Sequence, residues 1–200
     1  MGRPSNAEQR RPQIVRAAVR VVARHGFDGA SVQAIAKEAG LSPGLLHHHF
    51  GSKADILYAV LEHLEALVEL RHEALAARRR GAWGRLEAWI DAHLARGEGS
   101  EPEAVAAWVW IGAKALEDAE LRSRYRAVVE RRLTSLTELV EAVAREQGAR
   151  LDARALAVTT LAAIEGYYQL ASSTEVVPPG SAAPELGRWL RRILGGGRRP

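Results

Sequence analysis

The sequence contains no cysteine, which excludes a disulfide framework, a thiolate metal site and a cysteine nucleophile. Long hydrophobic runs are also missing. The two most apolar stretches, residues 104–113 and 155–164, are about ten residues long, whereas a helix that spans a bilayer needs about 20. The first residues, MGRPSNAEQRRPQ, contain no apolar segment of the kind found in signal peptides. These absences predict a soluble, cytoplasmic protein without a membrane partner.

Motifs of enzymes are missing as well. The chain has no H-E-x-x-H pair, no glycine loop that would cradle a phosphate and no G-x-S-x-G nucleophile motif. The run His47–His49 does not predict a metal site, because consecutive residues of a helix project about 100° apart. We therefore expect no catalytic residues, no metal and no cofactor, and the protein is not predicted to be an enzyme.

The residues that are present favour an all-α fold of about nine helices. The composition, 47% hydrophobic and 26% charged, is typical of a folded globular protein. Hydrophobic residues recur with the helical period, and no segment alternates with the period of a strand. Turn and capping signals place the helices from Pro12 to Gly26, after Ser31, from Pro43 to Gly51, over 53–80, 83–96, 102–117, 119–147, 152–172 and 183–194.

The positive charge is concentrated in the first third of the chain. Residues 1–60 hold eight basic and four acidic side chains, while the rest of the chain is balanced. A basic end favours a polyanionic partner, although a plain solvated surface would give the same tally. The chain is expected to divide into a head with a basic arm at 1–52, a helical body at 53–194 and a disordered tail at 195–200. Residues 53–80 would link the two domains.

The second and third predicted helices form a helix-turn-helix around Gly40. Leu41, Leu46 and Phe50 are expected to face the core, and Ile35 and Ala39 meet them from the second helix. This arrangement leaves five residues exposed at the start and on the outer face of the third helix: Pro43, Gly44, Leu45, His47 and His48.

Such a helix suits the major groove of DNA, where its N-terminal residues reach the base edges first. Gly44 permits a close approach, Leu45 suits a thymine methyl group, and His47 and His48 suit phosphates or purine acceptors. Lys53, at the start of the next helix, suits a phosphate. Three arginines are expected in an arm before the first helix that enters the minor groove: Arg3, Arg10 and Arg11.

Residues 14–64 resemble the N-terminal domain of TetR/AcrR-type transcriptional regulators. The resemblance rests on an apolar first helix, then HGF, then SVQAIAKEAG, then LSPGLLHHHFGSK. It implies a two-fold homodimer whose recognition helices enter successive major grooves of a palindromic operator in double-stranded DNA. It also implies DNA contacts by Ser31, Gln33 and Ser42. Two residues depart from the family pattern: His47 stands where the family usually has Tyr, and Ala34 replaces the common Asp or Glu.

The body is similar to the C-terminal domain of the choline-responsive betaine regulators. AAWVWIGAKALEDAELRSRYRAVVERRLTSLTELVEAVAREQG and TTLAAIEGYYQL carry this similarity, over about residues 104–172. It implies a small-molecule pocket within helices five to eight and a dimer through helices eight and nine. The eighth segment is apolar on two faces, which agrees with packing on two sides.

Five residues are the candidates for the effector pocket: Trp89, Trp108, Trp110, Glu165 and Tyr168. Aromatic rings attract a quaternary ammonium by cation–π interaction, and Glu165 would neutralise a cation. The alternative is that the aromatic residues are core or interface residues and that Glu165 is a paired interface carboxylate.

The sequence therefore predicts a ligand-responsive transcriptional regulator. It is expected to act as a repressor that a small molecule releases from its operator. The alternative is a helical protein that binds or scavenges a small molecule and whose DNA-binding head is not functional.

Overall fold

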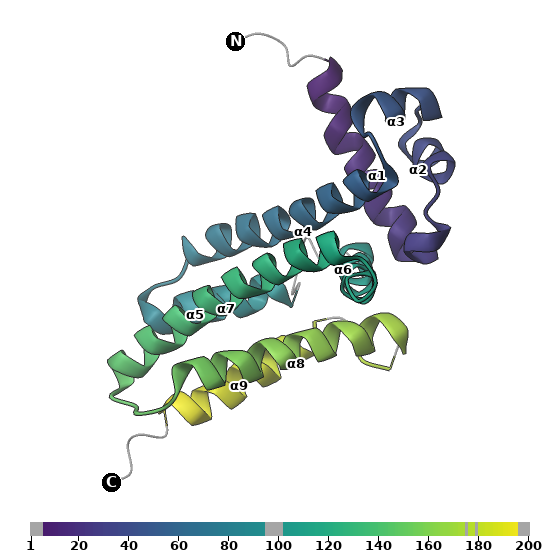
Figure 1. The fold of residues 1–200 in the computed structure, drawn as a ribbon. Coiled ribbons are helices and arrows are strands. Elements are labelled where there is room, and N and C mark those ends of the chain that lie inside the picture. The colour runs from purple at the N-terminus through teal and green to yellow at the C-terminus, as the bar shows by residue number, and fades with distance from the viewer. Residues whose placement is uncertain (1–5, 95–101, 175, 179, 196–200) are drawn as a thin grey trace. The chain divides into compact units, whose positions relative to one another are not determined.

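The computed structural model contains nine helices within the residues that it describes (Figure 1). These are residues 6–94, 102–174, 176–178 and 180–195, and for residues 6–9 only the backbone. The helices are α1 (Asn6–Gly29), α2 (Val32–Ala39), α3 (Pro43–His49), α4 (Lys53–Ala76), α5 (Gly81–His93), α6 (Pro102–Lys114), α7 (Ala119–Gln147), α8 (Ala153–Ser173) and α9 (Ala182–Gly195). The predicted all-α class is confirmed. None of the described helices is long and apolar enough to cross a membrane.

The largest differences from the predicted helix ends lie in the first and fourth helices. The first helix begins at Asn6 and runs through Pro12, so the prediction that Pro12 opens it is wrong. Residues 7–11 are good helix formers and extend the helix upstream of the proline. The fourth helix ends at Ala76 rather than Arg80, because the N–H groups of Arg78 and Arg79 bond to carbonyls three residues back and tighten the last turn.

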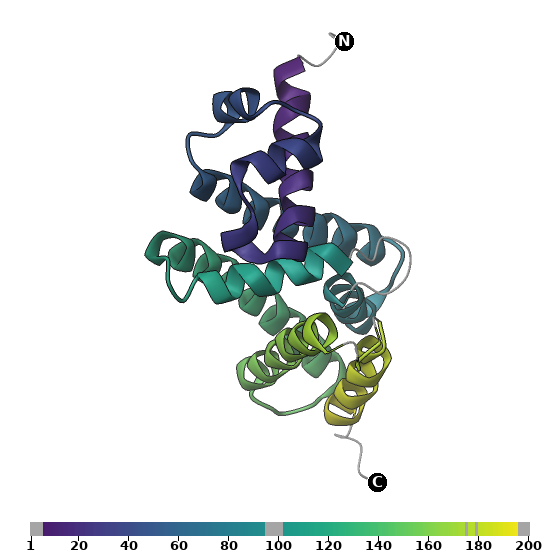
Figure 2. The same ribbon diagram turned by 90° about the vertical axis from the view of Figure 1, so that its right-hand side faces the viewer.

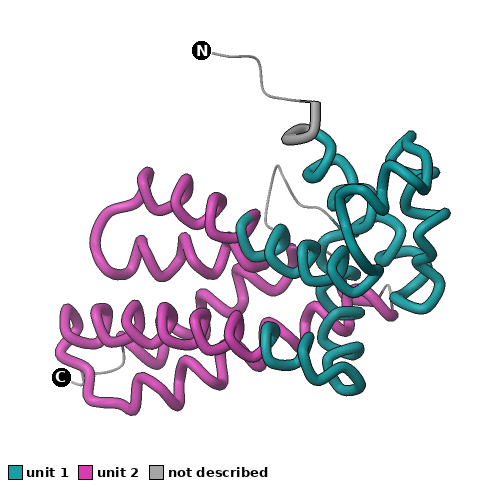
Figure 3. Tube along the Cα trace, turned by 45° about the horizontal axis from the view of Figure 1, so that its top comes forward, with its two compact units in different colours: residues 1–66, 102–125 teal, residues 67–101, 126–200 magenta. Residues whose placement is uncertain are grey.

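The chain folds into two compact units (Figure 3). The first comprises residues 1–66 and 102–125, and the second comprises residues 67–101 and 126–200. The boundaries follow packing and fall inside α4 and α7. The functional division predicted at residues 52 and 53 therefore stays a prediction, and the predicted tail, apart from Gly195, lies outside the described residues.

In the first unit, α1 is the central helix. Its buried stripe consists of Val15, Ala18, Val19 and Val22, each of which is at most 5% exposed. The helices α2 and α3 pack on one side of it, and α6 crosses its C-terminal end (Figure 2). The stripe thus anchors the helix-turn-helix to the rest of this unit.

Gly26 breaks α1 where the sequence predicts the first helix to end. Its φ of 66° and ψ of −179° are not helical, and residues with a side chain rarely adopt them. A Cβ atom at this position would also lie 3.2 Å from the ring of Trp110 on α6. Backbone conformation and close packing therefore both require glycine here.

The second unit is built from the end of α4, α5, most of α7, α8 and α9. Its core includes Leu86, Ile90, Leu136 and Ile164, which are at most 2% exposed. The start of α5 is capped from a distant helix, because Oε1 of Glu146 accepts a hydrogen bond from the backbone N–H of Ala82 at 3.0 Å. The same core buries two side chains that carry or can carry a charge, His93 and Arg132.

Candidate DNA interface and effector site

Two serine caps set the helices of the helix-turn-helix. Oγ of Ser31 accepts a hydrogen bond from the N–H of Ala34 at 3.1 Å, and Oγ of Ser42 accepts one from the N–H of Leu45 at 3.3 Å. Gly40 makes the turn between them with a left-handed φ of 66°. The caps were predicted from the sequence and are confirmed, and they fix where α3 begins.

An ion pair holds α2 against α1. The carboxylate of Glu38 accepts hydrogen bonds from Arg20, with an Nε–Oε1 distance of 2.5 Å, and from Arg24. These bonds lower the pKa of Glu38 below its ordinary value. The position of α2, and therefore of the turn that follows it, is thus fixed by charge as well as by apolar packing.

The outer face of α3 is exposed as the sequence predicts. Leu46 and Phe50 are 1% and 2% exposed and hold the inner face of the helix. The five predicted recognition residues are all exposed: Pro43, Gly44, Leu45, His47 and His48. Gln33 on α2 is exposed as well. The start of α3 and the polar side chain of Gln33 on α2 are therefore both exposed to solvent.

Arg10 and Arg11 do not form the predicted arm. Arg10 and Arg11 lie within α1, so their predicted place before the first helix is wrong. Arg10 donates a hydrogen bond to the side chain of Gln13 at 3.0 Å, and Arg11 donates one to the carbonyl of His49 at 3.1 Å. The guanidinium of Arg11 also lies 4.2 Å from the ring centroid of Phe50. Arg3 lies outside the described residues.

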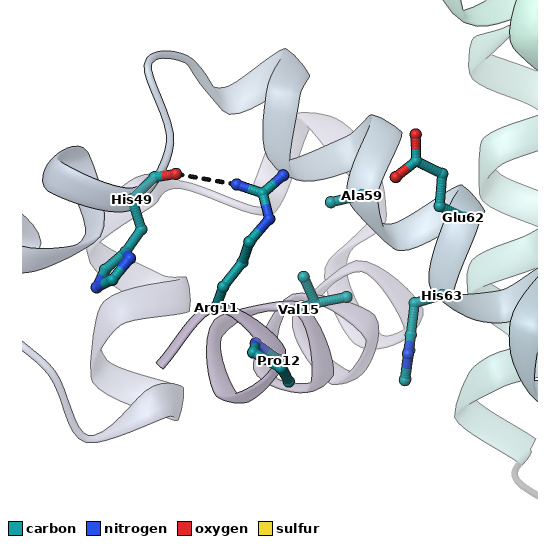
Figure 4. Close-up of a pocket in the computed structure, with 7 residues that line it drawn as sticks. All are labelled: Arg11, Pro12, Val15, His49, Ala59, Glu62 and His63. Atoms are coloured by element: carbon teal, nitrogen blue, oxygen red, sulfur yellow. Dashed lines mark hydrogen bonds between the residues drawn. The ribbon is translucent and has the colours of Figure 1, made fainter. Parts of the chain in front are cut away.

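An open cavity of about 640 Å³ lies beside this contact (Figure 4). It is lined from α1, α3 and α4 by Arg11, Pro12, Val15, His49, Ala59, Glu62 and His63. Over the described part of the chain, no three His, Asp or Glu side chains are grouped so that they could hold a metal ion. The guanidinium of Arg11 thus joins the end of α3 to the wall of this cavity.

The ammonium groups of Lys53 and Lys114 both lie near the aromatic ring of Phe27. Its Nζ lies 4.2 Å from the ring centroid of Phe27 and donates a hydrogen bond to the carbonyl of Asp28 at 3.4 Å. The Nζ of Lys114, at the end of α6, lies 5.0 Å from the same ring and 3.7 Å from a carboxylate oxygen of Asp28. Burial lowers the pKa of Lys53. In this structure Lys53 therefore contacts the turn between α1 and α2.

In the second unit, Trp89 and Tyr168 enclose His93. The rings of Trp89 and His93 are stacked with centroids 3.6 Å apart, and the hydroxyl of Tyr168 donates a hydrogen bond to the carbonyl of His93. Trp89, His93 and Tyr168 are each at most 5% exposed. Two of the predicted effector residues thus meet around a histidine that the sequence analysis did not select.

Glu165 completes this cluster from α8. It lies three residues before Tyr168, so the two side chains are neighbours on the helix surface. Its carboxylate is 3.8 Å from the guanidinium of Arg132, whose side chain is only 4% exposed, while that of Glu165 is 31% exposed. The predicted counter-ion for a ligand therefore faces a buried arginine of the protein itself.

Trp108 and Trp110 belong to the first unit. Trp108 is 3% exposed and packs on Tyr125, with ring centroids 4.9 Å apart. Trp110 is 45% exposed and covers Gly26. The five residues predicted for the pocket thus fall into two groups, with Trp89, Glu165 and Tyr168 gathered in the second unit. The assignment of Trp108 and Trp110 to the same pocket stays a prediction.

His93 and Arg132 are the residues that the sequence analysis missed. For His93 a signal was present, because it lies four residues after Trp89 in an apolar helix and so shares a face with it. For Arg132 there was none, since α7 carries six arginines and only the tertiary packing buries this one.

Comparison with known families gives two matches along the chain. Residues 14–60 match the model described as bacterial regulatory proteins, tetR family. Residues 83–195 match the model described as BetI-type transcriptional repressor, C-terminal. Together these matches cover the helix-turn-helix and most of the second unit.

Individual relatives agree with these matches. The chain is 34% identical over 181 residues to an HTH-type transcriptional regulator BetI of Agrobacterium fabrum, covering 88% of this chain and 84% of that protein. A TetR-family transcriptional regulator from a Rhodococcus species has the same fold, with a TM-score of 0.78 at 24% identity over 94% of this chain and 99% of that one. A transcriptional regulator from Saccharomonospora viridis, solved in complex with choline, has a TM-score of 0.79 at 22% identity over 96% of this chain and all of that one.

Proposed function

The chain belongs to the TetR family of bacterial regulatory proteins, with a BetI-type C-terminal domain, and we propose that it is a repressor that binds a palindromic operator as a homodimer. It is a transcriptional regulator with a DNA-binding helix-turn-helix and a ligand-binding domain, and not an enzyme. We place its action in the cytoplasm, where it would bind its operator and respond to a small molecule.

The observation that carries the DNA-binding proposal is the exposed start of α3. Pro43, Gly44 and Leu45 would reach base edges in the major groove, and His47 and His48 would donate hydrogen bonds to phosphates or purines. Gln33 is exposed at the start of α2 and Ser31 is half-buried there. These two residues and Ser42 would contact the backbone, as would Lys53 once it leaves the ring of Phe27.

Because Arg10 and Arg11 lie within α1, the role proposed for them differs from that of a flexible arm. Arg10 and Arg11 would contact phosphates from the side of a helix instead of entering the minor groove as an arm. Arg11 supports this role, because it already joins α1 to the last turn of α3. Arg3 remains a proposed contact by its place in the sequence alone.

Exposed apolar side chains on the last two helices support the proposed dimer. Val158 and Leu170 on α8 are 47% and 50% exposed, and Trp189 and Ile193 on α9 are 37% and 38% exposed. These exposed apolar side chains, on two helices that contact each other, are available to a dimer interface. A two-fold dimer would hold the recognition helices about 34–36 Å apart, one turn of DNA.

We assign the effector to the cluster around Trp89, Glu165 and Tyr168. Aromatic rings and a carboxylate suit a small cation that carries a quaternary ammonium group. A structural relative was solved with choline, and we propose a ligand of this kind here. A ligand that prefers the released conformer by about 100-fold would shift the equilibrium by about 2.7 kcal/mol, enough to free many operators.

A gel-shift of the purified protein on the DNA upstream of its own gene tests this function. In about 100 mM salt with excess competitor DNA, we expect a discrete complex that choline dissolves. The matched variant is His47→Ala and His48→Ala combined, which leaves the buried face of α3 intact and should lose the complex. A smear that competitor removes equally from both proteins would contradict sequence-specific binding.

A further inference from the structure

His47 and His48 place two groups that can gain a charge on the surface proposed to contact DNA. Both side chains are exposed on the outer face of α3. With the other described residues, neither ring forms a hydrogen bond or an ion pair, and His48 contacts only the edge of the His49 ring, with centroids 5.5 Å apart. An imidazole ordinarily changes its charge between about pH 5 and pH 8. Both rings are therefore accessible to a new partner and able to take up a proton.

The charges around α3 are mostly positive. The helices α1 and α2 pack against α3, and α4 follows it in the chain. Their ionisable side chains close to α3 in space or in the chain are Arg10 and Arg11 on α1, Lys37 and Glu38 on α2, and Lys53 and Asp55 on α4. The carboxylate of Glu38 is already neutralised by Arg20 and Arg24. Positive charge therefore outweighs negative charge here, and it disfavours a proton on either ring in the free protein.

DNA reverses this balance. Each phosphate of the duplex carries a negative charge, and an opposite charge within about 4–6 Å favours the protonated form of an imidazole. A protonated ring also donates hydrogen bonds from both nitrogens, whereas a neutral ring donates from one. The two side chains thus gain a proton most readily when they lie against the DNA backbone.

We propose that His47 and His48 take up protons when the protein binds its operator, so that the operator is bound more tightly as the pH falls from about 8 to 6. This inference rests on the DNA-binding function proposed above and adds a second input to it, beside the small-molecule effector. The sign follows from linkage, because the DNA-bound state holds more protons than the free state and acid favours the state that holds more.

The other ionisable groups of the chain do not account for such a dependence. Burial lowers the pKa of both His72 and His93, which disfavours protons on them in the folded protein. Carboxylates and arginines ordinarily keep their charge between about pH 6 and pH 8. A difference between wild type and a variant at His47 and His48 removes every contribution that the two proteins share.

Operator affinity at constant salt between about pH 6 and pH 8 measures the proton uptake. Fluorescence anisotropy of labelled upstream DNA gives this affinity for the full-length protein. If a phosphate favours the protonated ring by about tenfold, which is modest for two unit charges about 4 Å apart, the affinity should rise by about fivefold for each histidine. We expect a rise of about 25-fold when both histidines contribute.

Glutamine at these positions keeps a hydrogen-bond donor but cannot gain a charge. The double variant, His47→Gln with His48→Gln, should therefore still form the operator complex at about pH 8, and its affinity should be nearly the same at about pH 6. His63→Gln is the matched control, because it is the same substitution in the first unit, about 15 Å along α4 from Lys53. It should keep the wild-type rise. Thermal unfolding checks that each variant is folded.

The salt dependence gives a second readout that a merely structural effect of pH would not move. A protonated ring against a phosphate releases a further counterion, so the slope of the logarithm of affinity against the logarithm of salt should steepen by about 0.9 for each proton taken up. The double variant should give the same slope at both pH values. Loss of folded protein in acid would weaken binding without steepening the slope.

The proposal is overturned if the wild-type affinity is the same at the two pH values or falls on acidification, if the double variant keeps the rise, or if His63→Gln loses it. An operator complex that does not respond to pH removes only this inference. The absence of a complex at every pH removes the proposed DNA-binding function, and this inference with it.

Discussion

Gly26 and Gly44, both in the first unit, differ in whether the structure has room for a side chain at their position. Gly26 has a positive φ and a ring of Trp110 where a Cβ would stand, whereas a Cβ at Gly44 would meet nothing within 4 Å. Gly26→Ala should therefore lower the free energy of unfolding by about 1–3 kcal/mol. Gly44→Ala should leave it unchanged or raise it by up to about 1 kcal/mol, because alanine favours the helix.

Urea denaturation of the two variants measures this difference, and operator binding adds a second readout. Gly44→Ala should weaken the operator complex despite its stability, because the added methyl group stands where α3 would approach DNA. If Gly26→Ala were as stable as the wild type, the close contact with Trp110 would not exist in solution.

His93 gives the protein a defined response to pH. Its pKa is lowered in the folded state, so between that value and about 6.5 the unfolded chain binds a proton that the folded chain does not. Stability is therefore fully present above about pH 6.5 and falls below it, by up to about 1.4 kcal/mol per pH unit. His72, whose pKa burial also lowers, acts in the same direction.

The difference between wild type and His93→Gln isolates this contribution, because His72 and the carboxylates are present in both. Free energies of unfolding measured between about pH 5 and pH 8 should fall more steeply with acidification in the wild type. Parallel curves for the two proteins would show that His93 is not buried in its neutral form.

At the scale of single residues, the sequence predicts the contacts that a side chain makes with near neighbours in the chain. The hydroxyls of Ser31 and Ser42 each accept a hydrogen bond from the N–H group three residues further along the chain. Such a cap can therefore be predicted from the sequence alone. Arg132 and Lys53 show the limit, because their partners lie far away in the chain. Glu165 on α8 faces Arg132 on α7, and Phe27 on α1 contacts Lys53 on α4 although two helices separate them in the chain.

At the scale of elements, α3 depends on its first turn because it has only seven residues. A helix so short contributes few internal hydrogen bonds, and Ser42 satisfies one of its free N–H groups. Ser42→Ala should lower the free energy of unfolding by about 1 kcal/mol, while Ser42→Asp should preserve the cap. Chemical denaturation of both variants tests this, and equal stability of the two would contradict a role for the cap.

The faces of α8 show that hydrophobic periodicity predicts a helix more reliably than it predicts which face of the helix is buried. The sequence predicts that α8 is apolar on two faces, but it does not say which of its side chains the second unit itself buries. Leu156 and Leu161 are buried, whereas Val158 and Leu170 are exposed. A helix that is apolar nearly all round does not reveal in its sequence which stripe meets its own core.

At the scale of the whole molecule, the proposed dimer would bury the exposed apolar side chains of α8 and α9. Val158→Glu should turn a dimer into a monomer, because the charge would have to be buried unpaired in the interface. Leu116→Glu is the matched control, since Leu116 is 77% exposed in the turn after α6. Light scattering coupled to size exclusion distinguishes the two states, and a dimer that survives Val158→Glu would place the interface on another face.

The measurement that tests the central claim most directly is the affinity for the upstream DNA as a function of salt. A regulator that contacts phosphates through Lys53, Arg10 and Arg11 releases counterions, so the logarithm of the binding constant should fall linearly with the logarithm of salt concentration. The slope should lose about 0.9 for each phosphate contact removed, and Lys53→Gln should show this while Leu116→Gln does not. A flat salt dependence, or the same slope in all three proteins, would contradict the account.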